Sequence, residues 1–150
     1  MEERVEAMLD SNVTNSELKL LTEKFNKAMR EGKCDVDTKF QYAVTLSRSR
    51  LSADHHRAIT LLEDLCVSGD PEAFRDYLFY LIIVNIKLHD YVRALECAKK
   101  FLEIEPSNRQ VQDLKDYADK KRFNNGMKGL AIVGGAVLAA GALVMAFKSK

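Results

Sequence analysis

The sequence has little of what marks secreted, metal-binding or nucleic-acid-binding proteins. It has no tryptophan and two prolines, and its three cysteines form no CxxC or cysteine–histidine spacing, so neither a disulfide framework nor a zinc site is indicated. Three of the 23 basic residues follow residue 127, so residues 1–127 carry 20 basic against 22 acidic side chains. This balance excludes the basic face of a nucleic-acid binder. The acidic N-terminal residues resemble neither a secretory signal nor a mitochondrial transit peptide.

Catalytic and metal-binding patterns are also missing. His55 and His56 are adjacent, so on a helix they would point about 100° apart and could not share a metal ion. The paired carboxylates, such as Glu63 with Asp64, fall on predicted solvent faces without a catalytic base nearby in the sequence. No glycine-rich phosphate loop follows a strand. We therefore expect no enzyme activity, no cofactor, no metal ion and no small-molecule substrate.

A long uncharged run is the strongest feature of the sequence. Residues 129–147 contain no charged side chain, and as a helix they would extend about 28 Å, close to the hydrocarbon thickness of a bilayer. Lys128 precedes the run, and Lys148 and Lys150 follow it, so cations can reach both interfaces. We expect residues 127–147 to form a transmembrane anchor in a lipid bilayer, with residues 148–150 as a short basic tail.

The place and composition of this anchor predict a topology. Only three residues follow the uncharged run, so insertion would be post-translational and would leave the N-terminal part in the cytosol. By analogy, moderately hydrophobic anchors with basic flanks favour the mitochondrial outer membrane or the peroxisomal membrane. Ala131, Gly135 and Ala139 recur every four residues, a ridge that lets two membrane helices approach closely. A homo-oligomer formed through this ridge is therefore an open alternative.

Residues 14–124 predict an all-α domain of six amphipathic helices, preceded by an arm at residues 1–13. Thr14 with Glu17 forms a capping box, and Asp70 before Pro71 is a clear helix start. The other predicted starts are near Asp37, after Ser52, at Asp90, and at Ser107 with Gln110. Short links between these helices imply antiparallel neighbours, as in a six-helix bundle or short superhelix.

Two segments fit tetratricopeptide-like repeats. Ala94 follows Tyr91 in a typical second-helix segment that Pro106 closes, and Ala58 lies 36 residues upstream of Ala94, close to the 34-residue period of this repeat. We expect Ala58, Tyr91 and Ala94 to pack where the two helices of each repeat cross. Two repeats are fewer than the three usually needed, so the first and sixth helices would cap the stack.

The repeat register predicts a concave groove that binds a partner. With Ala58 and Ala94 as equivalent positions, the inner wall is lined by Phe40, Ala43, Ser47, Arg50 and Leu51 from one repeat, and by Asp76, Phe79, Ile83, Ile86 and Lys87 from the other. This mixture of apolar and charged side chains suits a peptide or helix lying in a groove. Alternatively, residues 1–13 cover the groove, since Val5, Met8 and Leu9 have helical spacing. Both hold if the arm gates the site.

Four strings, in order along the chain, resemble the mitochondrial fission 1 protein family of tail-anchored adaptors. They are Phe40-Gln41-Tyr42-Ala43, Leu46-Ser47-Arg48-Ser49, Arg75-Asp76-Tyr77-Leu78-Phe79-Tyr80-Leu81 and Gly129-Leu130-Ala131-Ile132-Val133-Gly134-Gly135. The resemblance implies an outer-membrane and peroxisomal receptor that helps recruit a dynamin-related GTPase, directly or through adaptor proteins, to divide the organelle. Val84 departs from the family, in which glycine is usual there. The alternative is a tail-anchored adaptor for mitophagy or organelle tethering.

Overall fold

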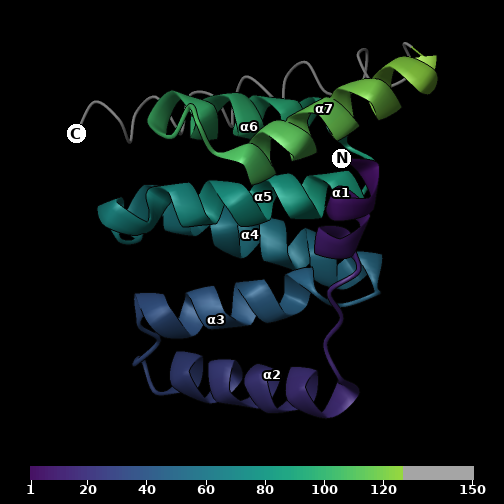
Figure 1. Ribbon diagram of the computed structural model, residues 1–150. Helices are drawn as coiled ribbons and strands as arrows, with labels where there is room; N and C mark the ends of the chain where they lie inside the picture. Colours follow the sequence, from purple (N-terminus) through teal and green to yellow (C-terminus); the bar gives the residue numbers. More distant parts are fainter. Residues whose placement is uncertain (127–150) are drawn as a thin grey trace.

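The computed structural model describes residues 1–126, which fold as a stack of α-helices (Figure 1). The helices are α1 (Glu2–Leu9), α2 (Asn15–Arg30), α3 (Val36–Ser47), α4 (Ser52–Ser68), α5 (Phe74–Lys87), α6 (Tyr91–Ile104) and α7 (Arg109–Asn124), with a 3-10 turn, η1 (Pro71–Ala73), before α5. From α2 to α7 each helix packs against the next one in the sequence. The predicted all-α, tetratricopeptide-like class is confirmed. The described residues contain one helix more than the six expected, because the arm folds as α1.

The helix α1 lies far from its neighbour in the sequence. Its contacts are with α7 and α5, whereas α2 lies at the opposite end of the stack (Figure 1). The linker between α1 and α2 therefore crosses the stack, and the first and last described helices lie side by side. This return of the N-terminus places α1 near one end of the predicted groove.

Two helix starts agree with the capping prediction. The Thr14 hydroxyl accepts a hydrogen bond from the Glu17 N–H over 3.1 Å, and the Asp90 carboxylate accepts one from the Arg93 N–H over 3.2 Å. Each bond satisfies a backbone donor that has no partner within the first turn of its helix.

Three other starts lie within one to three residues of the prediction. Asp35, not Asp37, caps α3 through the Thr38 N–H, over 2.7 Å, and Asn108, not Ser107, caps α7. In each case two nearby residues have a side chain that can cap, and the residue with the extended backbone, Asp35 or Asn108, is the cap. Asp70 caps the 3-10 turn η1, so α5 begins three residues later than Pro71.

One apolar core runs through the stack. Ala58 and Ala94 are both fully buried and Tyr91 is 7% exposed, as close helix crossings would require. The largest fully buried side chains are Tyr42, Leu46, Leu62, Leu65, Tyr77, Leu78, Ile82 and Leu114. All three cysteines are free thiols, and burial raises the pKa of Cys66 to about 12, so this thiol stays protonated and packs as a small apolar group.

The predicted membrane anchor, with its flanks Lys128, Lys148 and Lys150, lies outside the described residues. Within residues 1–126, none of the helices combines the length and the apolar character needed to cross a membrane.

Candidate functional site

The predicted groove residues lie on α3 and α5 and in the turn that follows α3. They divide into two groups by exposure. Asp76 and Arg50 are exposed, and Phe79 and Lys87 are half-buried. Ala43, Ser47, Ile83 and Ile86 are at most 5% exposed. Ile83 and Ile86 were expected to line an open groove, but here they belong to the buried core cluster. A partner therefore reaches them only if the residues that cover them move.

The arm lies over the C-terminal end of α5. Val5 is fully buried, and Met8 and Leu9 pack against the core. The Arg48 guanidinium donates from Nη2 to the backbone carbonyl of Asn12 over 2.8 Å, and Nε of Arg50 donates to the Asn12 side-chain oxygen over 3.2 Å. In this structure the arm therefore covers one end of the predicted groove, as the alternative interpretation of residues 1–13 proposed.

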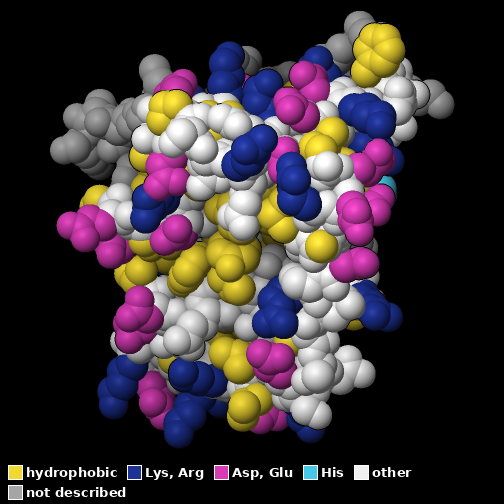
Figure 2. Space-filling view, in the orientation of Figure 1, with side chains coloured by type: hydrophobic (Ala, Val, Ile, Leu, Met, Phe, Trp, Pro, Cys, Tyr) yellow, Lys and Arg dark blue, Asp and Glu magenta, His cyan; other side chains and the backbone are white. Residues whose placement is uncertain are grey.

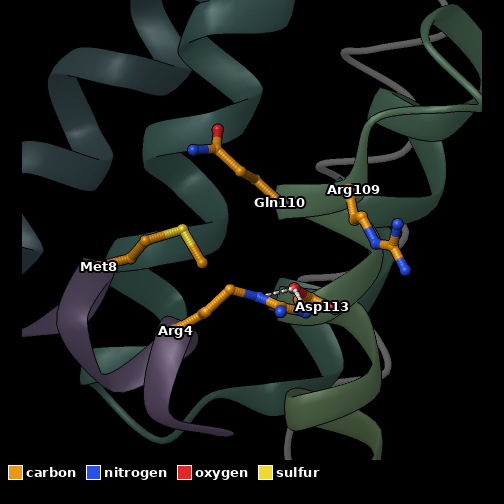
Figure 3. A pocket seen from close by; sticks show the side chains of 5 residues that line it. All are labelled: Arg4, Met8, Arg109, Gln110 and Asp113. Atoms are coloured by element: carbon orange, nitrogen blue, oxygen red, sulfur yellow. Dashed lines mark hydrogen bonds and ion pairs between the residues drawn. The ribbon is translucent and has the colours of Figure 1, made fainter. Parts of the chain in front are cut away.

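Ion pairs join α1 to α7 as well. Arg4 donates two hydrogen bonds, of 3.0 and 2.8 Å, to one carboxylate oxygen of Asp113. Figure 3 shows Arg4 and Met8 of α1 facing Gln110 and Asp113 of α7 across a shallow pocket. Nearer the start of the chain, the Glu2 carboxylate lies 3.2 Å from Nζ of Lys120 and 3.8 Å from Nζ of Lys121.

The covered end of the groove is cationic. Nζ of Lys87 donates to the Ser47 carbonyl over 2.6 Å, and burial, followed by the charge of Arg48, lowers the pKa of Lys87. Among the described residues, the Glu17 carboxylate lies 3.9 Å from Arg48, and the charge of Asp10 acts in the opposite direction on the pKa of Lys87. Arg48, Arg50 and Lys87 form what we call the cationic end of the groove. It attracts hydrogen-bond acceptors and anions; here Asn12 supplies acceptors to the two arginines and Ser47 supplies one to Lys87.

The opposite end of the groove is open and aromatic. Phe40, Phe79 and Tyr80 line a pocket there, with ring centroids 5.7 Å apart for Phe40 and Tyr80 and 5.4 Å apart for Phe79 and Tyr80. Figure 2 shows hydrophobic side chains gathered on this face between α3 and α5. The rim is charged: Arg75 pairs with Glu105 and lies 4.0 Å from Asp76. We call this the aromatic end of the groove.

Three participants were missed by the sequence analysis. Tyr80 lies one residue beyond the predicted inner-wall position Phe79, Glu105 follows α6 rather than lying on a first helix, and Asn12 belongs to the arm. Helical periodicity gives no signal for Glu105 or Asn12, because both reach the site through the packing of distant segments. Within residues 1–126, no three histidine, cysteine or acidic side chains are grouped as metal ligands. The arrangement suits recognition of a protein segment, with an apolar and a cationic end.

Comparison with known proteins agrees with the resemblance in the sequence. A family model described as the Fis1 C-terminal tetratricopeptide repeat matches residues 75–127. The mitochondrial fission 1 protein of Mus musculus is 38% identical over 139 residues, covering 93% of this chain and 91% of the relative. That of Neurospora crassa is 36% identical over 129 residues, covering 85% and 82%.

Solved structures show the same fold. Yeast Fis1 in complex with an Mdv1 fragment superposes with a TM-score of 0.71 at 23% identity, covering 79% of this chain and 92% of that chain. The solution structure of the yeast mitochondrial fission protein Fis1 has the same TM-score and covers 85% and 88%. The identity of the curated relatives over nearly the whole length establishes the family. The chain therefore belongs to the mitochondrial fission 1 protein family and is an adaptor in mitochondrial fission.

Proposed function

We propose that this chain is a tail-anchored receptor of the mitochondrial outer membrane and of peroxisomes, which recruits a dynamin-related GTPase, its adaptor proteins, or both. The observation that carries the proposal is the groove between α3 and α5, with an aromatic end open to solvent and a cationic end under the arm. In this proposal residues 14–124 are the scaffold, residues 1–13 the gate, residues 127–147 the anchor and residues 148–150 a basic tail.

The uncharged run supports membrane attachment. Residues 129–147 are long enough to span a bilayer as a helix, and Lys128, Lys148 and Lys150 supply interfacial cations at both ends. We expect the full chain to stay with mitochondrial membranes after carbonate washing and residues 1–126 alone to be released. A released full chain would contradict the anchor.

The two ends of the groove suggest how a partner binds. An apolar partner side chain enters the aromatic end first, on Phe79, because that end is open. When the arm moves away, Ile83 and Ile86 extend the apolar floor, and the cationic end accepts an acidic partner side chain. Phe79 and Lys87 are eight residues apart on α5, or about 12 Å along the helix. A helical partner segment would therefore carry its apolar and acidic side chains about eight residues apart.

A solved relative supports a protein segment as the ligand. The yeast Fis1 structure contains an Mdv1 fragment with an N-terminal extension and coiled coil domains. An amphipathic segment is the kind of ligand that lays its apolar face into a hydrophobic groove. For this chain we propose a partner of the same chemistry, either an adaptor protein or the GTPase itself.

The test is Phe79→Glu in the full chain. Phe79 is half-buried at the edge of the open end, so the glutamate reaches water in the free protein but faces the partner's apolar side chain in the complex, where an unpaired charge costs several kcal/mol. Each 1.4 kcal/mol is a tenfold loss of affinity, so capture of the GTPase and its adaptors should fall below detection. Mitochondria and peroxisomes should then elongate.

The matched control is Leu20→Glu, because the side chain is 63% exposed and lies on α2, a helix that carries none of the groove residues. It introduces the same charge in place of an exposed apolar side chain and should leave capture unchanged. A folded Phe79→Glu protein that still captures the fission partners would place their binding surface elsewhere. Loss of a mitophagy or tethering partner, with fission partners retained, would favour that alternative role for the groove.

A further inference from the structure

The C-terminal end of α7 is basic and ends in an exposed aromatic side chain. Lys120, Lys121 and Arg122 are consecutive, and Phe123 is 85% exposed. No other large hydrophobic side chain in residues 1–126 is as exposed. Three cations beside a solvent-facing phenyl ring are the composition of a surface that lies on a bilayer, with the ring in the interface and the cations among the headgroups.

The charges at this end are only partly neutralised. Within residues 1–126, Glu2 of α1 is the one carboxylate within ion-pair distance of Lys120 and Lys121, at 3.2 and 3.8 Å. Arg122 pairs with Asp119 on its own helix, at 3.3 Å. All of these side chains are solvent-exposed to a third or more, from 35% for Lys121 to 54% for Lys120. Three cations thus share two carboxylates, and one of those carboxylates belongs to the arm.

The sequence places this surface next to the proposed anchor. The uncharged run begins at Gly129, six residues after Phe123, and a chain of that length reaches at most about 21 Å when fully extended. Once the run is inserted, α7 is tethered beside the headgroups. Cytosolic membrane surfaces carry anionic lipids that attract lysine and arginine side chains. An anionic headgroup and the Glu2 carboxylate are therefore rival partners for the same two ammonium groups.

The Glu2 ion pairs and the attraction of the lysines to anionic headgroups have similar strengths, so the headgroups can compete with Glu2. Ion pairs between exposed side chains are weak and screened by salt, whereas attraction to an anionic surface acts on every cation at the end of α7 and is at least as large for each. On an anionic membrane Glu2 loses its ion pairs with Lys120 and Lys121, whereas each lysine gains contacts with several headgroups.

We propose that the basic end of α7 docks on an anionic membrane surface and that the headgroups displace Glu2 from Lys120 and Lys121, which loosens α1. The inference rests on the proposed membrane attachment. Its consequence is local: α1, which packs against α7 and α5, is held less firmly on an anionic membrane than on a neutral one. The charge of the lipids thereby changes how often the arm uncovers the groove, although the lipids themselves do not contact the groove.

The experiment uses the full chain inserted into two kinds of nanodisc, one of neutral phosphatidylcholine and one of phosphatidylcholine with about one third anionic lipid. Both are measured at the same ionic strength, close to the physiological value. Hydrogen exchange of the peptide covering residues 1–10 reports the arm. We expect it to exchange about two- to fivefold faster in the anionic discs, the factor that loss of one exposed ion pair produces. Peptides from α3 and α4 should exchange equally in both.

Variants separate the proposed competition from a general effect of charge. Lys120→Gln with Lys121→Gln should give fast exchange of the arm in both discs, and so should Glu2→Gln, because in each the pairing is already gone. Lys19→Gln with Lys33→Gln, two exposed lysines of the α2 region, removes the same charge and should keep the difference between the discs.

Two results overturn the proposal in distinguishable ways. If the chain inserts into both discs but the arm exchanges at the same rate in each, the competition is absent while the membrane receptor stands. If the chain inserts into neither, the anchor fails, and this inference fails with it.

Discussion

The arm offers a direct test of what holds the groove closed. Val5 of α1 is fully buried, and burial of a valine side chain contributes about 1.5–3 kcal/mol relative to exposure. The best-defined polar contact of the arm is Arg4 with Asp113, but the Arg4 side chain is 61% exposed, so this pair contributes about 1 kcal/mol or less. The apolar contact should therefore dominate. Val5→Asp removes it and also leaves a carboxylate in an apolar site.

We expect Val5→Asp to open the arm at least tenfold, since each 1.4 kcal/mol is a factor of ten, and Arg4→Gln to open it less than about fivefold. If the closed arm blocks the partner, the apparent affinity rises in proportion to the open fraction. Hydrogen exchange of residues 1–10 measures the opening, and recovery of fission partners from cells measures the consequence.

The matched control is Ala7→Asp, which places the same carboxylate on the exposed side of the same helix. It should change neither exchange nor partner recovery. The reasoning is refuted if Arg4→Gln opens the arm as far as Val5→Asp, because ion pairs would then hold it. It is equally refuted if Val5→Asp opens the arm and partner recovery stays constant, because the arm would then not be a gate.

Three further predictions concern the scaffold. Ala94→Leu overpacks a fully buried position and should destabilise the fold by about 1–3 kcal/mol, seen as a lower melting temperature, whereas exposed Ala53→Leu should not. Gly69→Ala should also lower it, because a Cβ there would lie 2.5 Å from the Leu65 carbonyl and 2.9 Å from the Tyr77 ring; an unchanged melting temperature would refute the contact. Burial lowers the pKa of His55 in the folded protein, so the imidazole binds a proton at higher pH in the unfolded chain than in the folded one. The urea midpoint of unfolding should therefore fall as the pH drops below about 6.5. His55→Gln should reduce this pH dependence of the urea midpoint, and His56→Gln should not.

Local chemistry explains most of what the sequence predicted correctly about the helices. Thr14 and Asp90 cap their helices through bonds to residues three positions away, and such bonds can be read from spacing alone. Where two adjacent residues can cap, as with Ser107 and Asn108, composition does not choose between them. The backbone angles at the helix start decide, and they depend on how the preceding turn packs.

The groove was predictable only in part, for a physical reason. Helical spacing places Phe79 and Ile83, four residues apart, on one face of α5. Spacing does not reveal that Ile83 is buried in the core, because burial depends on how segments distant in the sequence pack against α5. Asn12, which accepts hydrogen bonds from Arg48 and Arg50, likewise has no periodic signal.

The helix α1 is itself suited to be a cover that opens. It has eight residues, and its N-cap Met1 makes no side-chain capping bond. Isolated helices much shorter than about twelve residues are marginal in water, so α1 depends on Val5 and its ion pairs to stay helical. Undocking would therefore allow it to unfold, and the entropy gained by the freed residues would offset part of the lost burial. A docked helix and an unfolded arm are then two discrete states with a small free-energy difference, which is the condition for a weak signal to shift access to the groove.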